Sequence, residues 1–465
     1  MGLSWLSQSF GHSLGSWISL HAWQAQVGLV ACGLLVLLAV AVRARRRRAA
    51  SYAARAPDAA ESLRRALRAV LAPSPSPVAD AARAGPVSGV TEAFEKDLET
   101  AARTVLIAAG GHRGEAKEML RQRLHADADW LGEGGRSGDA AACWRQLGAL
   151  SLLDDSSDGL TAYARAAELA PTDAEAQMLA GVLHLRAGNL AAAEAAFRRQ
   201  IEVSSTDGAR IWRYRGCTML GDAYAARSAY AEATAAYAEA QHEAEAMEKE
   251  APGAASLRRD LSVTFDRLGD AFARQGALDA ALANYRRSLE IVAALAASAP
   301  DEPLWLRDQS VSHDRIGDIL DRQGDYAGAL QSFQQGLQLA QHLASLDTGN
   351  AQWQWDLSIS HDRIGDMHLA LGNAEAALQS YHRSLAIAEA LAASDPSNIA
   401  WRRDLAVSYH KAGSLEAARQ NPGAARDLLQ KGRAIIAGLE RIAAYQTQWR
   451  ADLAKFDREL QGLSG

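Results

Sequence analysis

Residues 305–352 read WLRDQSVSHDRIGDILDRQGDYAGALQSFQQGLQLAQHLASLDTGNAQ, and residues 353–400 read WQWDLSISHDRIGDMHLALGNAEAALQSYHRSLAIAEALAASDPSNIA. Laid over one another without a gap, the two stretches share their first tryptophan and the five residues DRIGD. A gap-free period of 48 residues that recurs this often indicates a solenoid of stacked repeats. Its tryptophan, glycine and alanine positions are Trp305, Trp353, Trp401 and Trp449; Gly269, Gly317, Gly365 and Gly413; and Ala281, Ala329, Ala377 and Ala425.

Each 48-residue unit predicts two helices. In the unit quoted first, helix A covers 306–322 and ends near Gly324, because glycine readily takes the left-handed conformation of a helix C-cap. Helix B covers 326–345 and ends at a polar turn. Two-residue alternation of apolar side chains is almost absent, so little or no sheet is expected. We expect mid-helix glycines such as Gly317 to lie where the backbone of the neighbouring helix crosses.

The order of these small and aromatic residues resembles the tetratricopeptide repeat. That family has a small residue in helix A, glycine at the turn, and alanine then an aromatic residue in helix B. Residues 174–207 match its 34-residue form through Gly181, Gly188, Ala193 and Phe197, with His184 where the family usually has an aromatic residue. The resemblance covers about 140–465 and implies an all-α, right-handed superhelical solenoid that binds proteins or peptides. The 48-residue units resemble the long-helix bacterial versions.

The chain divides into seven segments, and the transmembrane helix expected at 23–42 precedes the solenoid. The segments are an extracytoplasmic tail (1–22), the transmembrane helix (23–42), a basic collar with a Pro/Ala-rich linker (43–90), a helical lead-in that resembles a degenerate repeat (91–139), two repeats of about 34 residues (140–207), five 48-residue repeats (208–448) and a capping helix (449–465).

The charge distribution supports the membrane prediction. Residues 1–42 contain no Lys, Arg, Asp or Glu, and 27–42 read VGLVACGLLVLLAVAV. Residues 43–70 carry +7 of the total of −6, which leaves −13 for the rest of the chain. Because Lys and Arg beside a span stay on the cytoplasmic side, we expect a single pass in a bacterial inner membrane, with the N-terminus outside and the repeats in the cytoplasm. The expected anchoring residues are Trp23, Arg43, Arg45, Arg46, Arg47 and Arg48.

Paired aspartates recur on helix A, four residues apart and therefore on one face. By resemblance to the family, that face lines the concave groove of the superhelix. Two interpretations stay open: an internal ladder, in which Arg of one repeat bridges Asp of the next, or an acidic groove for a basic peptide. The candidate groove residues are Asp266, Asp270, Asp314, Asp318, Asp362, Asp366, Arg267, Arg315 and Arg363.

Catalytic patterns find no support in the sequence. The glycine-rich stretch 110–115 lacks the Gly-Lys-Ser/Thr of a phosphate loop, and His313 and His361 lie on copies of one structural unit. We therefore expect no enzyme activity, cofactor or metal, and a body of charge −13 makes nucleic acid an unsuitable partner. The leading hypothesis is a membrane-anchored protein-interaction scaffold. The alternatives are a regulatory subunit of a membrane enzyme or signalling complex, and a self-assembling membrane-attached array.

Overall fold

A computed structural model of the chain describes residues 93–101, 113–152, 158–204, 210–442 and 448–463. Within these residues every regular element is an α-helix. One helix covers 93–101, and we call it the lead helix. The others are α4 (Arg113–Glu133), α5 (Ser137–Leu152), α6 (Asp158–Leu169), α7 (Ala174–Arg186), α8 (Leu190–Val203), α9 (Arg210–Ala226), α10 (Tyr230–Glu250), α11 (Ala255–Arg274), α12 (Leu278–Ser298), α13 (Pro303–Arg322), α14 (Tyr326–Leu346), α15 (Ala351–Ala370), α16 (Ala374–Ser394), α17 (Ile399–Ala418), α18 (Pro422–Ile442) and α19 (Gln448–Gly462).

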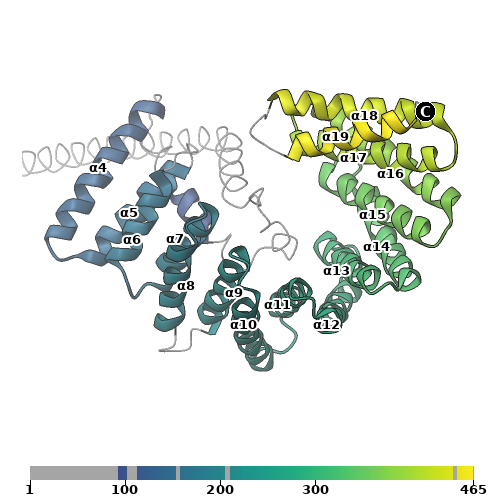
Figure 1. Cartoon of the computed structure of the whole chain (residues 1–465). Helices are drawn as coiled ribbons and strands as arrows, with labels where there is room; N and C mark the ends of the chain where they lie inside the picture. The colour runs from purple at the N-terminus through teal and green to yellow at the C-terminus, as the bar shows by residue number, and fades with distance from the viewer. Residues whose placement is uncertain (1–92, 102–112, 153–157, 205–209, 443–447, 464–465) are drawn as a thin grey trace, which may run out of the picture.

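The helices stack in sequence order as antiparallel pairs along an open arc (Figure 1). From α7 to α17 the odd-numbered helices, which are helix A of each pair, lie toward the inner side of the arc. The prediction of two helices per unit is confirmed, because α13 and α14 begin and end within three residues of the predicted bounds. The all-helical solenoid is likewise confirmed.

An aromatic ring packed on a glycine holds the pairs α11–α12, α13–α14 and α15–α16 together, whereas Leu429 takes that place on Gly413 in α17–α18. A Cβ added at Gly269, Gly317 or Gly365 would lie 2.4–2.5 Å from the ring of the helix-B aromatic in the same pair. Real Cβ atoms do not approach that closely, so the position requires glycine. The prediction that a neighbouring backbone crosses here was wrong in detail, because the neighbour is the aromatic side chain. The rings belong to Tyr285, Phe333 and Tyr381, and the alanines at the predicted register, Ala281, Ala329, Ala377 and Ala425, are fully buried.

The turn between the helices of a pair needs a left-handed residue. Gly276, Gly324 and Gly372 occupy it with φ of 81°, 82° and 80°. At the same register in two other pairs stand Ser228 and Gln420, with φ of 64° and 62°. These two residues adopt a conformation that disfavours a Cβ, so the fold imposes the turn even where the sequence lacks glycine.

The membrane-anchoring predictions fall outside the described residues. These are the span 23–42 with Trp23 and the arginines between 43 and 48. Residues 110–112 of the glycine-rich stretch also lie outside the described residues. Among the helices that the structure does describe, none combines the length and apolarity needed to cross a bilayer.

Candidate interaction surface on the inner helices

The predicted site residues lie on α11, α13 and α15, three consecutive inner helices (Figure 1). Equivalent positions on these helices are 48 residues apart, and the printed contacts join residues separated by 45 or 49. Those separations are the period minus three or plus one. Since residues three or four apart share a helix face, each contact links facing sides of neighbouring inner helices.

One ladder connects a cation on each inner helix to carboxylates on the preceding one. Arg315 contacts Asp266 at 2.5 Å and Asp270 at 3.3 Å. These pairs are largely enclosed, with the Arg315 side chain only 7% exposed. The other rungs are Arg267 with Asp222 (2.8 Å), Arg363 with Asp314 and Asp318 (2.5 and 3.1 Å), and Lys411 with Asp366 and Asp362 (2.7 and 3.9 Å). We call this set the Asp–Arg ladder.

In the 48-residue repeats, the rungs of the Asp–Arg ladder also include the aromatic ring that packs on the mid-helix glycine. The guanidinium of Arg315 lies 5.7 Å from the ring centre of Tyr285, whose hydroxyl donates to Asp270 at 2.6 Å. Lys411, Tyr381 and Asp366 repeat this arrangement. The cation–π contact therefore joins helix B of one repeat to helix A of the next, and the charge-assisted hydrogen bond joins the two helices of one repeat.

A second ladder runs in the opposite direction and was not predicted. Arg259 contacts Asp308 at 2.7 Å, so α11 supplies a cation to α13 while receiving Arg315 from it. Arg307 contacts Asp356 in the same way at 3.0 Å. In the next unit Trp355 replaces the arginine and donates its indole N–H to Asp404 at 2.7 Å. The 48-residue spacing of Arg259 and Arg307 was the feature of the sequence that could have predicted this second ladder.

Two carboxylates share one cation in three rungs of the described Asp–Arg ladder. Burial raises the pKa of Asp266 to about 6, and Asp270 adds to the rise while Arg315 opposes it. Burial likewise raises the pKa of Asp362 to about 6 against the opposing Lys411. A buried carboxylate that shares its cation is harder to ionise, because the single positive charge does not offset both desolvation penalties.

The second aspartate of two rungs is the part of the ladder that faces solvent. The side chains of Asp318 and Asp366 are each 42% exposed. Beside Asp318 a depression opens between α13 and α15, with Trp353 and Trp355 in its wall. An exposed carboxylate and aromatic side chains that line one depression suit a partner segment with basic residues.

The last rung has its donor and acceptor sides reversed. His410 and Ser414 stand 48 residues after Asp362 and Asp366, and Glu459 of α19 stands 48 residues after Lys411. Glu459 accepts from the Ser414 hydroxyl at 2.6 Å and lies 2.8 Å from Nε2 of His410. The carboxylate thus comes from the later helix, while the donors come from the earlier one. This exchange of donor and acceptor sides makes α19 complementary to α17.

All nine candidate groove residues take part in contacts between neighbouring repeats. They form an internal ladder with the direction reversed from the interpretation, because each cation contacts aspartates of the preceding repeat and not of the next. Partner binding by these residues stays a prediction. Asp266, Arg267 and Arg315 are buried, whereas Asp318 and Asp366 present the larger exposed surfaces.

Comparison with known proteins identifies the repeat. The tetratricopeptide repeat family matches residues 153–202 and 369–432. No curated protein matches the chain. Solved structures similar to it include the apo form of RapI (14% identity, 74% of this chain and 87% of that chain, TM-score 0.46) and BtubC (BKLC) from P. vanneervenii (17%, 54% and 92%, 0.44). Another is YrrB, described as a TPR protein with an unusual peptide-binding site (17%, 52% and 96%, 0.31).

The paired helices, the glycine–aromatic contacts and the family match together define a helical repeat solenoid. The chain contains tetratricopeptide repeats, at residues 153–202 and 369–432 by the family match. Proteins of this kind generally mediate protein–protein interactions, and the fold is typically a non-enzymatic scaffold.

Proposed function

We propose that the protein is a membrane-anchored scaffold that binds a basic segment of a partner protein on the inner helices α13–α17. The observation that carries this proposal is the surplus of carboxylate in the ladder. The rungs that contain Asp318 and Asp366 each hold two aspartates against one cation, and these two aspartates are the exposed members. A partner cation would be attracted to these exposed carboxylates.

The depression between α13 and α15 gives the partner a place to anchor. Trp355 stands where the preceding repeats have arginine, so the depression that Asp318 also lines has an aromatic wall. A basic segment can lay an apolar side chain on this wall and direct the charge of another residue to the carboxylate. The site is therefore suited to a partner in which basic residues alternate with short apolar ones.

Co-purification from membranes tests this surface directly. The Asp318→Asn and Asp366→Asn double variant removes the two exposed charges and leaves the more enclosed Asp314 and Asp362 in place. We expect partner proteins recovered with the wild-type chain to be lost from this variant. The matched control is Glu168→Gln with Glu290→Gln, which removes two charges from exposed helix-B positions. Equal recovery by both double variants would reject the proposed surface.

The anchor is the second part of the proposal, and the sequence supports it. The uncharged segment 27–42 is followed at once by Arg43 and four further arginines. This order places the basic collar against the cytoplasmic leaflet of a bacterial inner membrane, where anionic lipid attracts it. The solenoid would then present its inner helices to cytoplasmic partners.

Carbonate extraction of membranes distinguishes an anchored chain from an adhering one. The wild-type chain should stay in the membrane pellet at pH 11, and a chain lacking 23–42 should leave it. Recovery of both chains in the supernatant would reject the transmembrane anchor while leaving the interaction surface untouched.

A further inference from the structure

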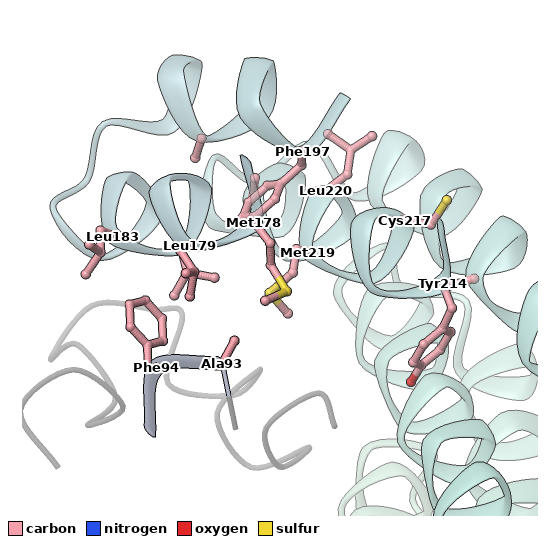
Figure 2. Packing of buried hydrophobic residues seen from close by; sticks show 14 of the residues in the cluster. Ala93, Phe94, Met178, Leu179, Leu183, Phe197, Tyr214, Cys217, Met219 and Leu220 are labelled. Carbon is pink, nitrogen blue, oxygen red and sulfur yellow. The ribbon is translucent and has the colours of Figure 1, made fainter. Parts of the chain in front are cut away.

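The lead helix occupies the inner side of the arc next to α7 (Figure 1). Phe94 and Leu98 are completely buried, and they belong to the same apolar cluster as Met178, Leu179 and Leu183 of α7. Figure 2 shows the Phe94 ring directed at Leu179 and Leu183, with Ala93 on the same side. A short segment from outside the two 34-residue repeats thus covers part of the inner face.

The positions under the lead helix are those of the Asp–Arg ladder, with a different chemistry. Counted from the mid-helix glycine Gly181, the residues equivalent to Asp266, Arg267 and Asp270 are Met178, Leu179 and Val182. All three are buried and apolar. The inner face therefore changes from apolar on α7 to charged on α11–α17, and the apolar part is the part that the lead helix covers.

A polar contact fixes how the lead helix docks. Asp97 accepts from Arg145 of α5 at 2.9 and 3.1 Å and from the hydroxyl of Tyr163 at 3.1 Å. In later repeats the equivalent tyrosine uses the aspartate that follows the mid-helix glycine of its own pair. In this first pair that position is Ala149, so the lead helix supplies the missing carboxylate.

We propose that α5 to α7 form a docking site for an amphipathic helix, and that the lead helix is an internal ligand covering it. The matching partner is a protein helix with an aromatic residue, aspartate three residues later and leucine four residues later, as in Phe94, Asp97 and Leu98. Such helix-in-groove recognition uses one face of the bound helix. Lys96, Glu99 and Thr100 lie on the exposed face, so recognition does not use them.

The chain between the lead helix and α4 makes the internal ligand a strong competitor. Only residues 102–112 separate them, and a short connection gives an effective concentration on the order of millimolar. A partner helix must outcompete that concentration, or the lead helix must first be removed. The site thus rests on the proposed role in protein binding and adds a means of regulating it.

A peptide of residues 91–101, made helical by a staple through exposed positions 96 and 100, tests the site on the full-length chain. The staple is needed because so short a helix is marginal in water. Fluorescence anisotropy should show at least tenfold tighter binding to the Phe94→Ala and Leu98→Ala double variant than to wild type. Adding Arg145→Ala to that variant should abolish the gain, and Glu99→Ala alone should behave as wild type. Equal binding by the double variant and wild type overturns the proposal.

Hydrogen exchange on the wild-type chain provides a second test that does not depend on the variant folding. A saturating amount of the stapled peptide should increase deuterium uptake in residues 93–101, because displacement exposes their amides. Unchanged uptake would mean that the lead helix is a fixed structural cap and would overturn the proposal. Either failure leaves the Asp318 and Asp366 experiment unaffected, since those residues lie on α13 and α15.

Discussion

Replacing Asp362 by asparagine should stabilise the protein at pH 7.5 and have no effect near pH 4. Asp362 lies in the rung where compensation is weakest, because Lys411 is 3.9 Å from it and 2.7 Å from Asp366. Burial therefore raises its pKa from 3.8 to about 6, with Asp366 and Asp404 adding to the rise while Lys411 and Ser384 oppose it.

The magnitude follows from that pKa. At about 1.4 kcal/mol per pH unit, a rise from 3.8 to about 6 corresponds to about 3 kcal/mol of unfavourable charge burial above pH 7. The folded state keeps the proton between about pH 4 and pH 6, where the unfolded state has already released it. Stability contributed by this group therefore falls as the pH rises through that window. Asparagine removes the charge, and we expect it to recover about 2 kcal/mol at pH 7.5.

Urea unfolding followed by circular dichroism at several pH values between 4 and 8 measures the effect. The difference in unfolding free energy between Asp362→Asn and wild type should grow from near zero at pH 4 to its full value above pH 7. Asp366→Asn is the control, because its side chain is 42% exposed and holds the closer contact with Lys411. A destabilised Asp362→Asn protein at pH 7.5, or a difference independent of pH, would refute the reasoning.

Three further predictions concern packing, turns and the last rung. Gly365→Ala places a Cβ 2.4 Å from Cε1 of Tyr381, so urea unfolding should show an unfolding free energy lower by about 2 kcal/mol. Gly423→Ala is the control: no atom lies within 4 Å of its new carbon, so the unfolding free energy should stay unchanged. Gln420→Gly should stabilise the protein by about 1 kcal/mol, because Gln420 has φ of 62°, and Gly372→Gln should destabilise it. Melting temperatures that shift in the same direction for both variants would contradict the turn argument. Glu459→Arg should increase deuterium uptake in α19, and adding His410→Asp with Ser414→Asp should restore protection by recreating the rung of Asp362, Asp366 and Lys411. Failure of that restoration would show that register alone does not determine the pairing.

Sequence periodicity predicted the parts of the fold that repeat. A period of 48 fixed which residues are equivalent, and the glycine at the turn marked where helix A ends. The same register explains Ser228 and Gln420, since a residue aligned with Gly372 inherits its left-handed turn. Periodicity did not reveal that the mid-helix glycine faces an aromatic ring, because both residue types recur at the same interval and their contact is a matter of packing.

The sequence predicted the positions of the site residues but only some of the contacts that they make. The Asp and Arg positions recur every 48 residues in the sequence. Because neighbouring inner helices stack side by side, the recurrence predicts that these residues come close together. The lead helix was beyond such reasoning, because a single short segment has no second copy to align. The interpretation of 91–139 as a lead-in that resembles a degenerate repeat stays a prediction, and the contacts of Phe94 and Asp97 with α5 and α6 come from the structure alone.

The same positions of helix A carry different chemistry along the arc, and this bounds where a partner can bind. Glycine–aromatic contacts hold the pairs together at other positions, so the inner positions vary without loss of the fold. They are apolar under the lead helix, carry Asp and Arg on α11–α15, and are reversed where Glu459 of α19 meets His410. The apolar inner face is thus covered by the lead helix, and the end of α17 is occupied by α19. An end-to-end array would have to displace α19 and offer a carboxylate to His410 and Ser414, whereas a basic partner needs only the exposed carboxylates between α13 and α17. The charge pattern therefore favours a scaffold that binds along its inner face over one that grows from its ends.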